Sequence, residues 1–393
     1  MSDALILDIL LVILLLGYVV YGFVNGLSRS LFVIAGVVAG AIAAYFLVPI
    51  VSAWVPWAWF RPGATIAATL LLILAGHALG STVGKGVRSG IEKTALSGID
   101  RLLGAALTGI AAALIASVVG ASVGQLGFPL LSRAIAGSSV LRTISTLTPD
   151  PVEAWVAQLR GVVAASGLPV ISDAFGGSSP TIPQIDTGSA ALNQAAQSVV
   201  RITGNAYACG VAQSGTGFVV SPDRIVTNAH VVAGVTEPVV ESPNGQAVAG
   251  TVVYFDPIGD LAIIAAPGLT AAPLPLGPTA AVGADAAVMG YPFGGPFTVG
   301  AATVLRVSEV LVDNIYGTGR NLRDVYTLAA DVRQGNSGGP LLGLDGTVIG
   351  VIFATSAETA NVGYAVTMEE LNPVASAAPT LSAAASTGDC VVG

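Results

Sequence analysis

Long apolar runs with almost no charge fill the first 125 positions of the chain, and polar or turn-forming residues become frequent only after them. Four runs are long enough to cross the roughly 30 Å of a bilayer's hydrocarbon core as helices. They cover residues 5–24, 31–50, 64–84 and 102–124. The pattern predicts an all-α domain of four transmembrane helices over residues 1–125. The first run does not match a signal peptide, because Asp3 and Asp8 stand where basic residues belong.

Small residues recur four positions apart in these runs, as at Gly36 and Gly40 and at Gly104 and Thr108. Such faces are typical of helices that pack closely in lipid. His77 is ionisable and lies within the third run, so it is a candidate functional group. Asp8 has the same status, although it also fits a position near the outer interface.

The basic residues between the runs predict an orientation. Five of them lie in the loops after the first and third runs, whereas the loop after the second run has only Arg61. The positive-inside rule places those two loops in the cytoplasm and both chain termini outside. The five are Arg29, Lys85, Arg88, Lys93 and Arg101. The sequence thus predicts a multi-pass inner-membrane protein with its C-terminal half outside the cytoplasm.

The composition changes after residue 125, and residues 126–188 are expected to be a linker. Asp150 and Pro151 suit the cap and first position of a short amphipathic helix. The stretch 175–189, "FGGSSPTIPQIDTGS", is rich in Gly, Ser and Pro, as flexible linkers are.

Short β-branched runs separated by turn signals fill residues 189–393. About a dozen such runs are typical of an all-β domain built as one antiparallel barrel or two. The net charge of −8 and the lack of a basic patch argue against a nucleic-acid partner. With two histidines and two widely spaced cysteines, we expect neither a metal nor a cofactor.

Residues 331–340 read "DVRQGNSGGP", with Ser337 among permissive glycines. Such a turn can aim successive backbone N–H groups at one point, as in an oxyanion hole. The alternative is an ordinary glycine-rich hairpin turn. If Ser337 is a nucleophile, it needs a base.

His230, in "RIVTNAHVV", is the only imidazole in the C-terminal half, although a single His beside apolar residues is more often a core residue. Asp260, in "FDPIGDLAII", directly precedes an apolar run and is the candidate for orienting the imidazole. Its alternative role is to cap a turn, and Asp256 competes for the position beside the histidine.

The motifs "TNAHVV", "GDLAII" and "GNSGGPLL", in this order, resemble those of the chymotrypsin-fold serine proteases, including the bacterial trypsin-like branch. The resemblance implies two six-stranded β-barrels with the active site between them. It makes His230 the general base and acid, Asp260 its orienting carboxylate and Ser337 the nucleophile. The backbone N–H groups of Gly335 and Ser337 would form the oxyanion hole.

The same resemblance places Asp331, six residues before the nucleophile, at the base of the S1 pocket, where it would favour Lys or Arg at P1. A solvated or ion-paired aspartate is the alternative, because HtrA-type relatives remodel this loop. The segment 350–355, "GVIFAT", should form the pocket wall through Ile352 and Phe353 and pair with the substrate backbone.

The N-terminal half resembles the colicin V production protein family, and the fusion resembles the actinobacterial membrane-anchored acid-resistance (MarP-type) serine proteases. The resemblance implies a serine endopeptidase that acts on cell-envelope proteins under acid stress and contacts the lipid bilayer. An exported domain lies in an oxidising space, where Cys209 and Cys390 are expected to form a disulfide, with two free thiols as the alternative. A catalytically inactive protease-like sensor or scaffold is the rival function. A transporter carrying a protease domain is weaker, because intramembrane charges are few.

Overall fold

The computed structural model describes residues 3–54, 61–91, 97–124, 131, 134–135, 137–149, 151–152, 169–171, 178–206, 211–389 and 391. The chain forms two compact units. One consists of Asp8–Ser117, and the other of Val118–Gly393 together with Met1–Leu7. The first unit is helical, and the second contains both β-sheets.

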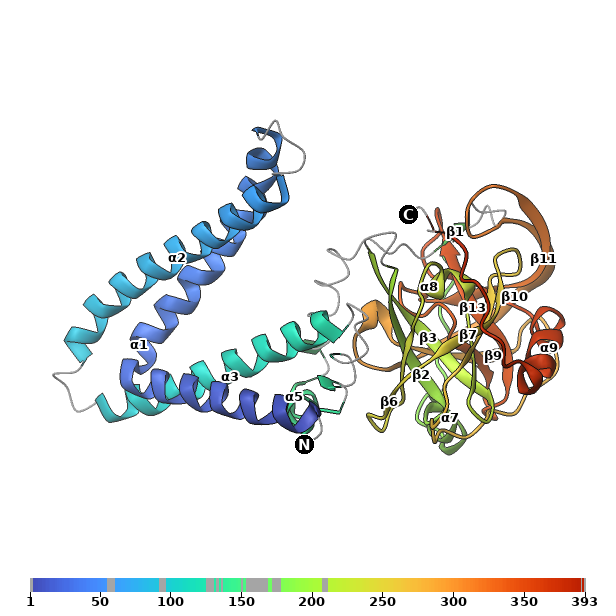
Figure 1. The fold of residues 1–393 in the computed structure, drawn as a ribbon, viewed down its shortest axis with the longest axis horizontal. Helices are drawn as coiled ribbons and strands as arrows, with labels where there is room; N and C mark the ends of the chain where they lie inside the picture. The colour runs from blue at the N-terminus through green and yellow to red at the C-terminus, as the bar shows by residue number, and fades with distance from the viewer. Residues whose placement is uncertain are drawn as a thin grey trace. The chain divides into compact units, whose positions relative to one another are not determined.

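Three apolar helices precede the sheets (Figure 1). They are α1 (Asp3–Trp54), α2 (Arg61–Ile91) and α3 (Ser97–Gly124). Each contains a candidate membrane span, so the described residues hold three such helices where four were predicted. The first two predicted runs both fall within α1, because Gly26 alone leaves the helical backbone, with φ 73° and ψ 166°. The polar stretch "NGLSRS" at 25–30 is therefore a bend in one element and not a loop between two.

The bend at Gly26 is supported by α3. A Cβ at Gly26 would collide with the carboxylate of Asp100, so the position requires glycine on steric grounds as well as for its positive φ. The Asp100 carboxylate accepts a hydrogen bond from the backbone N–H of Ser28 at 3.0 Å, which caps the second half of α1. Before the bend, Gly22 lies against Gly104 of α3, and after it α1 runs beside α2 (Figure 1).

Glycines bring α1 and α2 into backbone contact. A Cβ at Gly36 would collide with the carbonyl group of Gly76, and the reverse also holds. Gly40 and Gly80 lie equally close to the opposite helix. The predicted close packing of small-residue faces is thus confirmed, with the partner face supplied by α2. His77, beside this contact, is exposed on the surface of α2.

The predicted linker contains regular structure. Helix α5 (Ser139–Leu147) begins at Ser138, whose hydroxyl accepts from the backbone N–H of Leu141 at 3.1 Å. Strand β1 (Val170–Ile171) pairs in parallel with β13. The helix predicted from Asp150 lies outside the described residues beyond its second position.

The first sheet is an open row of seven strands in the order β6-β5-β2-β3-β4-β8-β7. Helix α7 (Ala190–Ala196) precedes it, and the short α8 (Ala229–Val232) follows β4. Its strands are β2 (Val199–Ala206), β3 (Val211–Ser221), β4 (Arg224–Thr227), β5 (Val239–Glu241), β6 (Ala247–Ala249), β7 (Thr251–Asp256) and β8 (Leu261–Ala265).

The second sheet runs β1-β13-β12-β9-β10-β11-β14, and β13 also pairs with β14. That pairing closes six of the seven strands into a ring. The pairings thus give one closed ring and one open row, where two closed six-stranded barrels were expected. The strands are β9 (Asp285–Gly290), β10 (Thr298–Asp313), β11 (Arg320–Ala330), β12 (Pro340–Gly343), β13 (Val348–Ser356) and β14 (Val362–Val366).

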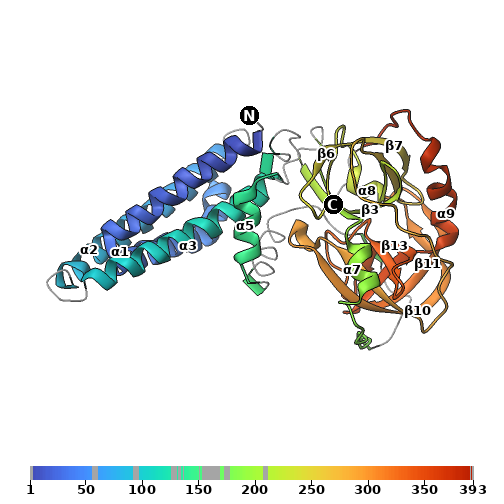
Figure 2. The same ribbon diagram turned by 90° about the horizontal axis from the view of Figure 1, so that it is seen from below.

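Short helical elements complete the domain. The 3-10 turn η2 (Pro292–Gly294) links β9 to β10. Helix α9 (Met368–Ala377) and the 3-10 turn η3 (Ala378–Thr380) follow β14, and Figure 2 shows α9 at the outer side of the second sheet.

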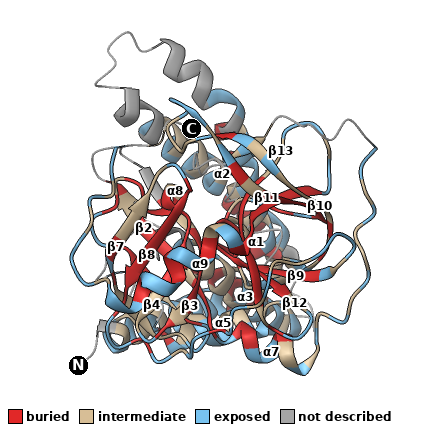
Figure 3. Ribbon diagram, turned by 90° about the vertical axis from the view of Figure 1, so that its right-hand side faces the viewer, coloured by how far each residue is buried: buried red, intermediate tan, exposed pale blue. Residues whose placement is uncertain are grey.

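Apolar side chains from both sheets share one core. Phe218 of the first sheet belongs to the same buried cluster as Met289 and Phe353 of the second. Each sheet also has a cluster of its own. Strands such as β8, β13 and β14 are accordingly buried along most or all of their length, whereas β10 is largely not (Figure 3). The shared core holds together the two segments that carry His230 and Ser337.

Candidate active site

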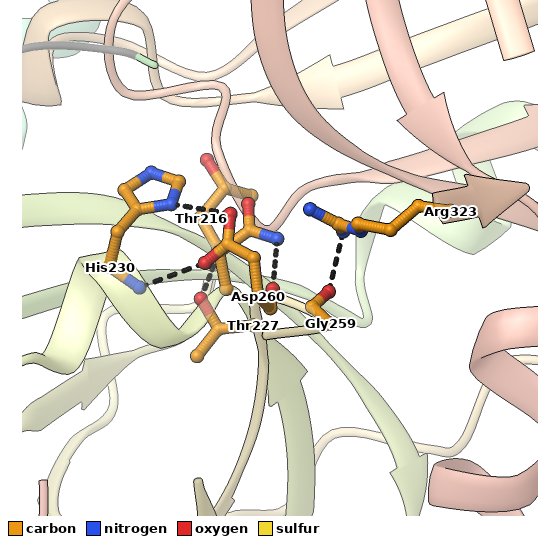
Figure 4. A network of polar contacts seen from close by, with 7 residues as sticks. Thr216, Thr227, His230, Gly259, Asp260 and Arg323 are labelled. Atoms are coloured by element: carbon orange, nitrogen blue, oxygen red, sulfur yellow. Dashed lines mark hydrogen bonds and ion pairs between the residues drawn. The ribbon is translucent and has the colours of Figure 1, made fainter. Parts of the chain in front are cut away.

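The predicted base and its carboxylate are joined by two hydrogen bonds (Figure 4). His230 lies in α8, and Asp260 lies in the turn before β8. Nδ1 of His230 is 2.8 Å from one carboxylate oxygen of Asp260, and the backbone N–H of His230 donates to the other at 3.0 Å. A carboxylate beside Nδ1 favours the tautomer with its proton there, which leaves Nε2 as a proton acceptor.

Asp260 is buried and held in a left-handed backbone conformation with φ 51°, which aspartate tolerates better than most residues. The side-chain amide of Asn228 donates to its carbonyl oxygen at 2.8 Å. Asp256, the other candidate, accepts instead from the backbone N–H of Ile258 at 2.9 Å. The carboxylate that contacts the imidazole is therefore that of Asp260.

Thr216 of β3 fixes the turn around Ser337. Its backbone N–H donates to the carbonyl of Ser337 at 2.8 Å, and its hydroxyl donates to the carbonyl of Gly335 at 2.6 Å. The hydroxyl of Thr227 in turn donates to the carbonyl of Thr216 at 2.8 Å. The carbonyl groups of Gly335 and Ser337 are thereby both hydrogen-bonded to β3. Thr216 was not predicted; its place between two glycines, in "GTG", is the only local signal.

The backbone N–H groups of Gly335 and Ser337 donate to no acceptor within the described residues. Gly335 has φ 93° and Gly338 has φ 79°, conformations that glycine alone adopts readily. Ser337 itself is only 3% exposed. Two unengaged donors beside one hydroxyl are what an oxyanion hole requires.

The turn packs on the segment that carries His230. A Cβ on Gly338 would collide with the hydroxyl of Thr227 and touch the backbone N–H of Asn228, two residues before the histidine. In the described part of the chain, no hydrogen bond joins the Ser337 hydroxyl to the imidazole. Such catalytic hydrogen bonds are often long without substrate and tighten in its complex.

Arg323 of β11 lies beside the Asp260 turn, next to Gly259, and was not predicted (Figure 4). Its guanidinium donates to the carbonyl of Gly259 at 2.5 Å and lies 4.4 Å from the centre of the Phe353 ring. Burial lowers the pKa of this guanidinium, while the carboxylates of Asp260 and of Glu370 and Asp256 oppose that shift. The buried cation therefore ties the turn of the first sheet to the predicted pocket strand of the second.

The three predicted pocket residues do not line one cavity. Asp331 is half-exposed and forms an ion pair with Arg333 at 2.8 Å. It lines a cavity of about 290 Å³ that includes neither Ile352 nor Phe353, both of which are buried in the core. The P1 preference expected from Asp331 stays a prediction.

The backbone of the predicted wall strand is partly engaged. Ile352 accepts from the N–H of Gly338 at 2.8 Å and donates to the carbonyl of Gly339 at 2.9 Å. Further along β13, the N–H of Thr355 donates to the carbonyl of Pro169 at 3.1 Å. Strand β1 thus occupies one stretch of the edge where a substrate strand was predicted.

Cys209 and Cys390 lie outside the described residues. Among the residues described, no group of three or more His, Cys, Asp or Glu side chains is arranged to hold a metal ion.

Two family descriptions match this chain. The colicin V production protein family matches residues 7–149, and the trypsin-like peptidase domain matches residues 215–351. The peptidase match contains His230, Asp260 and Ser337.

Among curated proteins, Serine protease Rv3671c of Mycobacterium tuberculosis is 35% identical over 365 residues, which cover 89% of this chain and 90% of that protein. The mitochondrial serine protease HTRA2 of Bos taurus is 37% identical over 162 residues, 40% of this chain and 34% of that protein. The crystal structure of the Rv3671c protease in its active form has a TM-score of 0.52 and 38% identity, and the match covers 57% of this chain and all of that one. The chain is therefore a serine protease of the family that includes Serine protease Rv3671c, with a colicin V production domain ahead of a trypsin-like peptidase domain.

Proposed function

We propose that the chain is a membrane-tethered endopeptidase that cleaves proteins through an acyl-enzyme on Ser337. The observation that carries the proposal is the doubly bonded His230–Asp260 pair beside a serine turn with two unengaged N–H donors. No metal or cofactor takes part in this chemistry.

In the proposed reaction each group has one step. As the Ser337 oxygen attacks the peptide carbonyl carbon, Nε2 of His230 takes the hydroxyl proton, and Asp260 stabilises the imidazolium. The N–H groups of Gly335 and Ser337 donate to the oxyanion. When the C–N bond breaks, His230 gives its proton to the leaving amine. Water then repeats the sequence on the ester and frees Ser337.

The test is activity-based labelling of the purified full chain with a fluorophosphonate, together with peptide hydrolysis. Ser337→Ala should abolish labelling, and both Ser337→Ala and His230→Ala should lower kcat by about 10⁴- to 10⁶-fold. Ser308→Ala, in β10, is the matched control and should retain both activities. A wild-type chain that folds but is neither labelled nor active would instead favour the sensor or scaffold function.

We further propose that α1 crosses the bilayer twice and turns at Gly26, which restores four crossings. Its candidate span of 41 residues is about 60 Å long, twice the hydrocarbon thickness. Polar groups gather at the bend, where Arg29 bonds to Asn25 and to the hydroxyl of Ser81. A bend of this composition suits the cytoplasmic interface and leaves the peptidase domain outside.

Single cysteines in a chain lacking Cys209 and Cys390 test this orientation with a membrane-impermeant maleimide on intact cells. Ser308→Cys should react and Ser89→Cys should react only after the cells are opened. Reaction of both in intact cells would contradict the proposed topology.

We also propose that the substrates are cell-envelope proteins and that cleavage supports survival in acid. His230 is the only histidine of the peptidase domain, so acid alone removes the base and slows the reaction. Any activation by acid must then come from other groups. Envelope proteomes of wild-type and Ser337→Ala cells, at neutral and acid pH, should differ most in acid; identical proteomes would refute this role.

A further inference from the structure

The loop around η2 sets the orientation of the peptide that carries one oxyanion donor. The backbone N–H of Phe293 donates to the carbonyl of Gln334 at 2.6 Å. The peptide bond is planar and trans, so the N–H of Gly335 points opposite to that carbonyl. Fixing the Gln334 carbonyl on the η2 loop therefore fixes the Gly335 N–H on the other side, beside Ser337.

This peptide requires an external contact. Gly335, at φ 93°, lacks the side chain that would disfavour rotation of the peptide before it. Phe293 is itself in the left-handed region, with φ 55°, which is strained for a residue other than glycine. The loop that holds the peptide must therefore be held in turn.

Arg201 holds the loop from the first sheet. Its guanidinium donates to the carbonyl of Gly294 at 3.2 Å and to the carboxylate of Glu241, its cross-strand neighbour on β5, at 2.5 Å. The side chains of Arg201 and Glu241 are only 18% and 24% exposed. Burial alone would lower the pKa of Arg201, but Glu241 raises it overall, so the cation persists.

We propose that Arg201 and Glu241 are positioning residues for the oxyanion hole. They act through the Gly294 carbonyl and the Phe293 N–H on the Gln334–Gly335 peptide. Neither touches the substrate. The inference rests on the proposed peptidase function. It means that residues of the first sheet orient the Gly335 N–H, an oxyanion donor that the second sheet carries. Losing the contact leaves His230 and Asp260 bonded but lets the Gly335 N–H turn away from the developing oxyanion.

The test uses the full-length chain with Arg201→Met, Arg201→Lys and Glu241→Gln. Kcat and KM are measured on one peptide, with the inhibition constant of a peptidyl trifluoromethyl ketone, whose adduct places an oxyanion in the hole. Arg201→Met should lower kcat by about 10- to 100-fold, raise that constant by the same factor and leave KM within about twofold. Arg201→Lys keeps the charge but lacks the planar fork that bonds both partners in a fixed geometry, so it should fall in between.

The exposed pair Arg320–Asp313 is the matched control, because it also joins an arginine to a carboxylate across two neighbouring strands, at 3.3 Å. Arg320→Met should leave all three constants unchanged. A merely structural role for Arg201 would lower the melting temperature but not kcat of the folded fraction, and that result would overturn the inference. If Arg201→Met does not fold, Arg201→Lys and Glu241→Gln decide by the same criterion. An unreactive wild-type chain would instead refute the proposed function, and the inference with it.

Discussion

Thr216 shows how a single side chain can join the two sheets at the site. Its hydroxyl is donor to Gly335 of the serine turn and acceptor from the backbone N–H of Tyr291 at 3.0 Å. The residue is fully buried, so neither partner can turn to water if the hydroxyl is lost.

Thr216→Val keeps the shape and removes only the hydroxyl. We expect the free energy of unfolding to fall by about 1–3 kcal/mol, because two buried backbone groups lose their partner. Kcat should fall as well, since the Gly335 carbonyl is no longer held. Thr203→Val in β2 is the control, because Thr203 is also a buried residue and no hydrogen bond joins its hydroxyl to another described residue. Equal stability losses from urea unfolding of the two variants would contradict this role.

At this scale, the residues with local sequence signals were the ones that could be predicted. His230, Asp260 and Ser337 each stand in a short recognisable motif. Thr216 and Arg201 do not, because the partners that give them a role lie 119 and 93 positions away. Arg323 could not be predicted from the alternation of side chains along its strand, because that pattern places charged residues toward solvent and apolar residues toward the core. Here the charged Arg323 faces the core, while Leu322 beside it is 62% exposed.

Among the elements, the apolar helices and the β-branched strands followed their patterns. The division of α1 did not, because hydropathy reports a polar stretch and not whether the backbone continues as a helix through it. The segments α5 and β1 are short and lie in a stretch of linker-like composition, and β1 is defined only by its pairing with the distant β13. Ring closure depends on the pairing of β13 with β14, which no local pattern encodes.

Gly76→Leu should disrupt the α1–α2 contact, since the new side chain would meet the carbonyl of Gly36. We expect a loss of about 2 kcal/mol or more for the helical unit. The measurement is thermal unfolding in detergent micelles, followed by helical circular dichroism. Gly86→Leu, also in α2, meets open space and should unfold like the wild type. Identical melting curves for both variants would disprove the contact.

At the scale of the whole peptidase domain, the C-terminal segment is hydrogen-bonded back onto the first sheet. The N–H of Ala385 donates to the carbonyl of Val252 at 2.8 Å, and the N–H of Gly234 donates to the carbonyl of Thr387 at 3.0 Å. The tail therefore lies along β7 and reaches the end of α8 shortly before Cys390.

We expect a Cys209–Cys390 disulfide to secure this tail. The two cysteines are 181 positions apart (390 − 209), and closing so long a loop contributes up to about 4–5 kcal/mol in the chain-entropy model. Cys390→Ser should lower the melting temperature of oxidised protein and leave reduced protein unchanged. Non-reducing peptide mapping checks the bridge directly, and two free thiols in envelope-derived protein would exclude it.

The pairing of β13 with β14 affects how fast different parts of the domain unfold locally. A ring has no outermost strand, so none of its members can detach without breaking hydrogen bonds on both sides. The open row has such a strand in the three-residue β6, which pairs only with β5. In deuterium oxide, the amides of β9 and β12 should exchange only through global opening, whereas those of β6 should exchange through local fraying, orders of magnitude faster. The two sheets would then differ in their exchange kinetics within a single domain, with the slow half carrying Ser337 and the fast half carrying His230.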